Sequence, residues 1–150
     1  MNRGRRCGSV SVEAALALGL ILVPLLLGVV DLGLGMIVHM RLDRAVQAAL
    51  FYAWGTPGPS TSAVQSAARS GYGASSPTLT ATAAIACYCI APTGTRQSGT
   101  VKSCTGTCTA GQALASWVTI NANASFSLPF PLPYLGSTFA LSSTATARIQ

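Results

Sequence analysis

Near its N-terminus the chain reads Arg3-Gly-Arg-Arg-Cys-Gly8-Ser-Val-Ser-Val-Glu13, which leads into Ala14-Ala-Leu-Ala-Leu-Gly-Leu-Ile-Leu-Val-Pro-Leu-Leu-Leu-Gly-Val-Val30. The second part contains no charged residue, and as a helix it spans about 25 Å, close to the hydrocarbon core of a bilayer. Arginines beside a membrane span stay in the cytoplasm, so the C-terminal side should lie outside. The sequence therefore predicts a single-pass membrane protein whose N-terminus is cytoplasmic.

Glu13 has two interpretations. In an ordinary signal anchor it would lie at the inner headgroups. A cleaved secretory signal is disfavoured, because the apolar run is too long and no small-x-small site closes it. The second interpretation is cleavage after Gly8, which would make Ser9 the mature N-terminus, one helical turn before Glu13. The terminal ammonium of a neighbouring subunit would then neutralise this otherwise costly charge in a helical bundle.

This arrangement resembles the class III signal sequences of type IV pilins and pseudopilins. As far as about Trp54, the chain is similar to the TadE family of tight-adherence (Tad/Flp, type IVc) pilus proteins. The residues that carry the resemblance are Arg5-Arg6, Gly8, Val12-Glu13, the leucine-rich run with Pro24, Val30-Asp31, and Arg41-Leu42 before an alanine-rich helix. Relatives often have an aromatic residue after the glutamate, where this chain has Ala14.

The resemblance implies a minor pilin or pseudopilin that a prepilin peptidase cuts between Gly8 and Ser9. It implies that Glu13 sets the register of assembly, so the function is assembly rather than catalysis. The implied partners are the prepilin peptidase, other Tad/Flp pilins, the pilus assembly-platform proteins and the bacterial inner membrane. The C-terminal domain would be periplasmic, or extracellular once the subunit has joined a pilus.

The N-terminal helix is predicted to continue beyond the membrane. If it is unbroken from Val10 to Trp54 it is roughly 67 Å long, so its outer half stands outside the bilayer. That half has an apolar stripe expected to pack on the outer domain: Leu42, Val46, Ala49, Leu50 and Ala53. The aromatic residues Phe51, Tyr52 and Trp54 are too far from Val30 for an interfacial belt, so they are predicted to be core residues.

Beyond this helix, a second short helix is predicted over residues 62–69, with Ser62 as its N-cap and Gly71 ending it. Apolar and polar residues then alternate over 79–89, 118–128 and 138–149, which is typical of half-buried antiparallel strands. The predicted fold class is α+β: a long N-terminal transmembrane helix, a short second helix, and a small antiparallel sheet of about three strands with two disulfides. The expected domains are a leader (1–8), a transmembrane and extended helix (9–54) and an outer head (55–150).

The cysteines divide by compartment. Cys7 would be lost with the leader, whereas Cys87, Cys89, Cys104 and Cys108 lie on the outer side, where an even number predicts two disulfides. Cys87 and Cys89 share one sheet face ~7 Å apart, so each should pair with one cysteine of the later loop. A zinc site of four sulfurs is the alternative, but the Cys-x-Cys and Cys-x3-Cys spacings depart from the usual ribbons.

Charge is scarce: 8% of residues are charged, and the three acids Glu13, Asp31 and Asp43 all lie in the first third. The net charge of +6 is spread thinly, so no nucleic-acid partner is predicted. Asp31 is interpreted as a residue at the outer headgroups or as a subunit contact. His39 is expected to form a helix-surface pair with Asp43, one turn away.

No phosphate loop, nucleophile elbow or paired carboxylate appears, so no enzyme activity, catalytic residue, metal or cofactor is predicted. Two other classes of function remain open. One is a non-pilus bitopic envelope protein that keeps its leader and carries a disulfide-bonded periplasmic binding domain. The other is an enzyme subunit whose catalytic site lies on another chain. Retention or removal of the leader distinguishes the first of these from a pilin.

Overall fold

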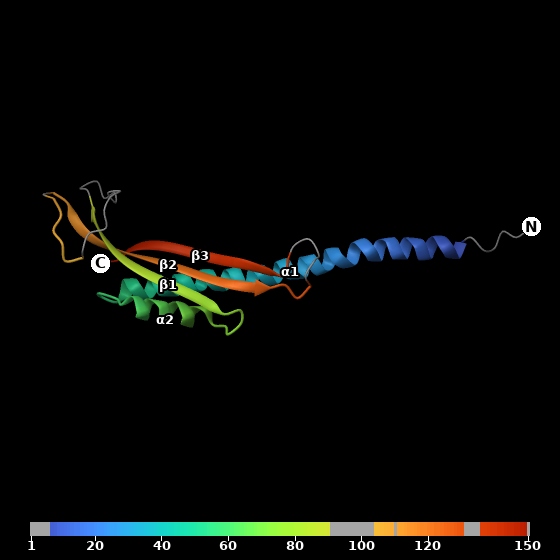
Figure 1. Cartoon of the computed structure of the whole chain (residues 1–150), viewed down its shortest axis with the longest axis horizontal. Helices are drawn as coiled ribbons and strands as arrows, with labels where there is room; N and C mark the ends of the chain where they lie inside the picture. Colours follow the sequence, from blue (N-terminus) through green and yellow to red (C-terminus); the bar gives the residue numbers. More distant parts are fainter. Residues whose placement is uncertain (1–6, 91–103, 110, 131–135, 150) are drawn as a thin grey trace, which may run out of the picture.

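A computed structural model describes residues 7–90, 104–109, 111–130 and 136–149, with side chains from residue 11 onward. The elements follow in the order α1 (Cys7–Gly55), α2 (Thr61–Tyr72), β1 (Leu79–Ile90), β2 (Ala113–Ser127) and β3 (Thr138–Ile149). Figure 1 shows α1 as a rod whose N-terminal half projects from the molecule, while α2 and the sheet lie along its C-terminal half. The predicted α+β fold with a long N-terminal helix, a short second helix and a three-stranded sheet is confirmed.

The sheet is antiparallel, with β2 in the centre and the order β1-β2-β3. β2 begins at Ala113, earlier than alternation alone predicted, because its pairing with β1 continues into a segment without a period-two pattern. β1 starts with Leu79 opposite Ala124, whereas β3 stays paired with β2 as far as Ser127. The end of β2, residues 125–127, therefore extends past β1 and is paired on one side only.

The core lies between one face of the sheet, α2 and the C-terminal half of α1. Leu42, Val64, Val118 and Ile120 are completely buried. The predicted stripe on α1 is confirmed, since four of its five residues are buried and Leu50 packs against them. The stripe is rich in alanine, which lets α2 and the strands approach the helix closely.

The ends of α2 differ from the prediction. Ser60, whose backbone is extended, is the N-cap, and its Oγ accepts a hydrogen bond from the N–H of Ala63 at 3.3 Å. Ser62 is already helical and so does not cap the helix. At the other end Gly73 is the C-cap with a left-handed backbone (φ 64°), and Gly71 lies inside the helix. The sequence pattern predicted the correct region but selected the wrong serine as N-cap.

The prediction that the aromatic residues near the end of α1 are core residues is wrong. They lie at the surface: Phe51 is 67% exposed, Trp54 is 52% exposed and Tyr52 is 38% exposed. The indole N–H of Trp54 donates to the carbonyl of Arg148 at 2.9 Å, and its ring meets that of Phe51 edge to face. The stripe with its small alanines faces the core, so the bulky rings are left on the other faces of the helix.

Candidate functional site: the exposed half of the N-terminal helix

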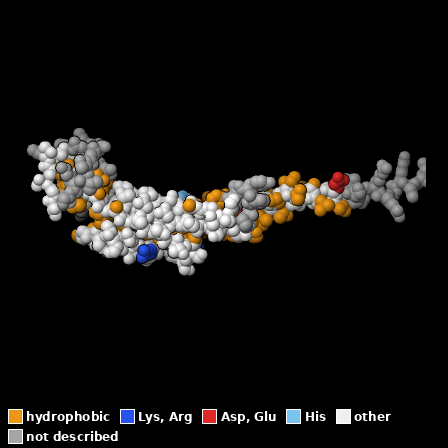
Figure 2. All heavy atoms as spheres, in the orientation of Figure 1, with side chains coloured by type: hydrophobic (Ala, Val, Ile, Leu, Met, Phe, Trp, Pro, Cys, Tyr) orange, Lys and Arg blue, Asp and Glu red, His pale blue; other side chains and the backbone are white. Residues whose placement is uncertain are grey.

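The N-terminal half of α1 is an apolar surface that the described remainder of the chain does not cover. Its large side chains are exposed, for example Leu20 at 81% and Leu16 at 70%. Figure 2 shows hydrophobic side chains along this projecting part. The segment Ser11–Gly55 is long and apolar enough to cross a membrane. A surface of this kind needs lipid or other apolar helices around it.

Glu13 is the only charged residue between positions 11 and 30, and it is exposed on this surface. Helix α1 begins at Cys7, so Gly8 and Ser9 lie in its first turn. Ser9 and Glu13 are thus i and i+4 residues of one helix, a spacing at which neighbouring positions share a face. The structure places the predicted processing and assembly residues on one element, at the opposite end of the molecule from the outer cysteines (Figure 1).

Asp31 is buried more deeply than its place in the sequence suggested. It is 5% exposed, and its Oδ1 atom has no hydrogen-bond partner among the residues that the structure describes. It lines an apolar cavity of about 490 Å³ between α1 and the ends of β2 and β3, together with Met36, Phe126 and Phe139. Because an unpaired buried carboxylate is costly, this environment does not fit a residue at the outer headgroups, and the alternative of a subunit contact stays a prediction.

The predicted pair of His39 and Asp43 is not formed among the described residues. The Oδ1 atom of Asp43 instead accepts a hydrogen bond from the Ser143 hydroxyl at 2.7 Å, which links α1 to β3. His39 is exposed and lines the same cavity as Asp31. The prediction was wrong because helical spacing shows which residues are neighbours but not which strand will offer a better donor.

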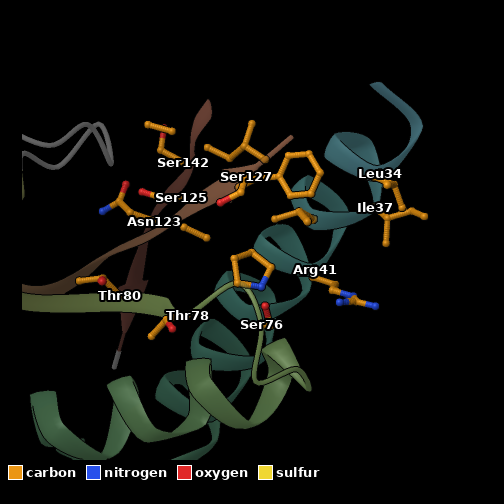
Figure 3. A pocket seen from close by; sticks show the side chains of 16 residues that line it. Leu34, Ile37, Arg41, Ser76, Thr78, Thr80, Asn123, Ser125, Ser127 and Ser142 are labelled. Carbon is orange, nitrogen blue, oxygen red and sulfur yellow. The ribbon is translucent and has the colours of Figure 1, made fainter. Parts of the chain in front are cut away.

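A larger groove, of about 1010 Å³, lies where β1 begins. Its walls are the α1 residues Leu34 to Arg41, the linker Ser76–Thr78, the end of β2 and residues 140–142 near the start of β3; Figure 3 shows the side chains around it. Arg41 is half-buried and has no carboxylate partner among the described residues. Burial raises the pKa of Tyr72, a neighbouring core residue, and the positive charge of Arg41 opposes that rise.

The outer cysteines form two bridges, Cys87–Cys104 and Cys89–Cys108, with Cα separations of 5.1 and 5.7 Å. The prediction that each strand cysteine pairs with one loop cysteine is confirmed, and the structure selects one of the two connectivities that the sequence left open. Because all four sulfurs are bonded to each other in pairs, they are not free to bind zinc. Within the described ranges no cluster of three or more metal-ligating side chains occurs.

Replacing Cys87 and Cys104 together with alanine is expected to lower the free energy of unfolding by roughly 3 kcal/mol, because the bridge closes a long loop in the unfolded chain. Denaturant unfolding of the full chain in detergent measures this change, and Cys7→Ala is the control that should leave it unaltered. Peptide mapping of the native protein without reductant should find no free outer thiol. Four alkylatable outer thiols in freshly isolated protein would refute the assignment.

Residues 8–50 match the family model described as TadE-like protein. The chain carries a TadE-like N-terminal segment. The match contains Gly8, Glu13 and Asp31, and it ends within α1, before α2 and the sheet. No curated protein and no solved structure matches the chain. The predicted resemblance to the TadE family is confirmed for residues 8–50, which lie in the helix and not in the disulfide-bonded head.

The roles of Gly8, Ser9 and Glu13 stay predictions, whereas the pairing of strand cysteines with loop cysteines was predicted correctly. The burial of Asp31 and the groove beside β1 were not predicted from the sequence. One signal for the groove was available. Pro77 precedes the first predicted strand, and proline is typically found at the start of a strand or on an edge strand, so it marks the end of β1 that lies beside the groove.

Proposed function

We propose that this protein is a TadE-type minor pilin or pseudopilin that joins or primes a Tad/Flp pilus. The observation that carries the proposal is the uncovered apolar half of α1, which lies in the TadE-like segment and bears Glu13 as its only charge between residues 11 and 30. The chain inserts into the bacterial inner membrane with its N-terminus inside and its head in the periplasm. Its partners are the other Tad/Flp pilins and the pilus assembly-platform proteins.

In this proposal, a prepilin peptidase removes residues 1–8 before assembly. Cleavage between Gly8 and Ser9 creates an ammonium group one helical turn from Glu13. In a bundle of parallel helices, the ammonium of one subunit pairs with the carboxylate of the next, so neither charge is left alone among apolar side chains. The long helix is the packing element and the disulfide-bonded head is the exposed part of the subunit.

The test of this proposal is the mass of the mature chain. Intact-mass measurement of membrane-purified protein, from cells with an active prepilin peptidase, should find a chain that begins at Ser9. Gly8→Leu should retain the leader, because a bulky side chain at the cut site blocks the peptidase. Gly4→Leu, which changes another leader glycine, is the matched control and should still be processed.

Native protein that still begins at Met1 in such cells would contradict the proposal. That result would support the rival class, an anchored envelope protein that keeps its leader and uses its periplasmic domain for binding.

A further inference from the structure

The end of β2 presents backbone hydrogen-bonding groups that none of the described strands uses. The N–H of Leu128 donates to the carbonyl of Ser137 at 3.0 Å, so position 128 points its backbone groups towards β3. These groups alternate in direction along an antiparallel strand, so those of Phe126 also face β3, while those of Ser125 and Ser127 face the opposite side. This is the side on which β1 lies, but the pairing of β1 with β2 begins opposite Ala124, so β1 itself does not extend to Ser125 or Ser127.

The larger groove lies along this free edge and has the dimensions of a short strand. Its apolar wall is the α1 face with Leu34, Ile37 and Val38, of which Leu34 is 37% and Ile37 is 45% exposed. From Leu34 to Arg41 the helix rises about 10 Å, which equals the length of about three residues of extended chain. The free edge of β2, residues 125–127, has the same length.

One end of the groove is closed by the segment that leads into β1. Ser76, Pro77 and Thr78 line it there, and Figure 3 shows Ser76 near Arg41, with Ser127 towards the opposite end. A strand added in line with β1 must therefore terminate at this point. Arg41 puts a positive charge there, which attracts a terminal carboxylate and repels a terminal ammonium. The positive charge of Arg41 therefore favours a bound peptide whose C-terminus, rather than its N-terminus, lies at this end of the groove.

We propose that this groove binds the extended C-terminal peptide of a partner protein, which adds antiparallel to β2 at Ser125–Ser127 and places its carboxylate beside Arg41. Strand addition at a sheet edge and capture of a terminal carboxylate are both established ways of recognising peptides. The peptide residue opposite Phe126 shares its face of the sheet and packs on Leu34 and Ile37. That position selects an apolar side chain.

The direction of the bound peptide also suits a membrane partner; this point rests on the proposed membrane insertion. The apolar run ends at Val30, and Leu34 follows about 6 Å further along the helix. A peptide that runs from the Leu34 end towards Arg41 therefore runs away from the bilayer. A single-pass partner with a short C-terminal tail on the outer side would present its chain in this direction.

Binding is tested with the full chain in detergent and fluorescently labelled hexapeptides of the pattern Gly-Gly-Val-Ser-Xaa-Ser, where Xaa is valine, leucine or phenylalanine. Peptides with a free C-terminus should bind at least about tenfold tighter than the same peptides with a C-terminal amide, measured by fluorescence polarisation. Arg41→Gln should remove this difference. Arg44→Gln, which changes an exposed arginine on the same helix, is the control and should preserve it.

The strand edge is tested with a pair of proline variants. Ser127→Pro removes an N–H that points into the groove, and the ladder with β3 is retained because that N–H faces away from β3. Thr138→Pro is the matched control, since Thr138 lies directly opposite Ser127 and its N–H points to the outer edge of the sheet. Ser127→Pro should weaken binding at least about tenfold, and Thr138→Pro should not.

Three outcomes would overturn the proposal: no binding of any free-acid peptide at about 1 mM, equal affinity for acid and amide, or loss of binding in Thr138→Pro with Ser127→Pro unaffected. Self-association of the chain that Ser127→Pro abolishes, and that no peptide competes with, would assign the groove to a second copy and would also overturn it. None of these measurements depends on leader cleavage, so this proposal and the proposed function can fail separately.

Discussion

Replacing Glu13 with alanine is expected to reduce incorporation of the protein into the pilus or its initiation complex by about tenfold or more, while membrane insertion, both disulfides and the folded head stay intact. Glu13 lies on the projecting half of α1, where it is exposed and far from the core. Its replacement therefore removes no contact that holds the head together. The effect should appear only when helices of different subunits come together.

The physical reason is the cost of burying a charge among apolar helices. At the bilayer edge water solvates Glu13, whereas in an assembled bundle an unpaired ion costs several kcal/mol. The Ser9 ammonium of an adjacent subunit is the partner that cleavage after Gly8 provides. Without Glu13 that ammonium has no partner, so the subunit joins less readily. Glu13→Asp keeps the charge with a shorter reach and should be intermediate, whereas Glu13→Gln keeps the shape and should resemble Glu13→Ala.

Membrane level, leader cleavage and co-purification with other pilus subunits should be compared for the parent chain and the three variants. Arg44→Gln, which removes an exposed charge elsewhere on α1, is the control that should assemble normally. If Glu13→Ala is processed and assembles as well as the parent, Glu13 does not set the register and is only a charge tolerated at the membrane edge.

The second large effect is expected at Gly71, where α2 crosses α1. A Cβ atom at this position would lie 2.5 Å from the Cβ of Ala48 and 3.1 Å from the carbonyl oxygen of Arg44. Neither atom can move without moving α1 itself. Gly71→Ala should therefore lower the free energy of unfolding by about 1–3 kcal/mol through overpacking, even though alanine favours a helix by up to about 1 kcal/mol over glycine.

Denaturant unfolding of the full chain measures the loss, and trypsin cleavage after Arg69, an exposed residue of α2, reports whether α2 separates from α1. Gly55→Ala is the matched control, since a Cβ at Gly55 has no atom within 4 Å; it should not lower stability. Equal stability of Gly71→Ala and the parent, with unchanged cleavage at Arg69, would show that the two helices accommodate the added methyl group at no cost and that the close contact does not matter.

The elements of this protein could be predicted because their signals are local. An uninterrupted run of apolar residues predicts a long helix, and strict alternation predicts strands, since each pattern reflects the periodicity of its own backbone. The strand cysteines share a face for the same reason. For Gly8, Ser9 and Glu13 only the spacing along the chain matters, and a helix converts that spacing directly into one turn.

What the sequence by itself determined was thus the helix, its buried stripe, the three strands and the residues proposed for processing and assembly. Only the tertiary structure decided which serine caps α2, which aromatic residues are exposed, how the cysteines pair and where Asp31 is buried. It also decided that β2 extends beyond the pairing with β1, so that residues 125–127 form an unpaired strand edge beside the groove that Arg41 lines. Each of these depends on contacts between segments far apart in the chain, and periodicity within one segment carries no information about such contacts.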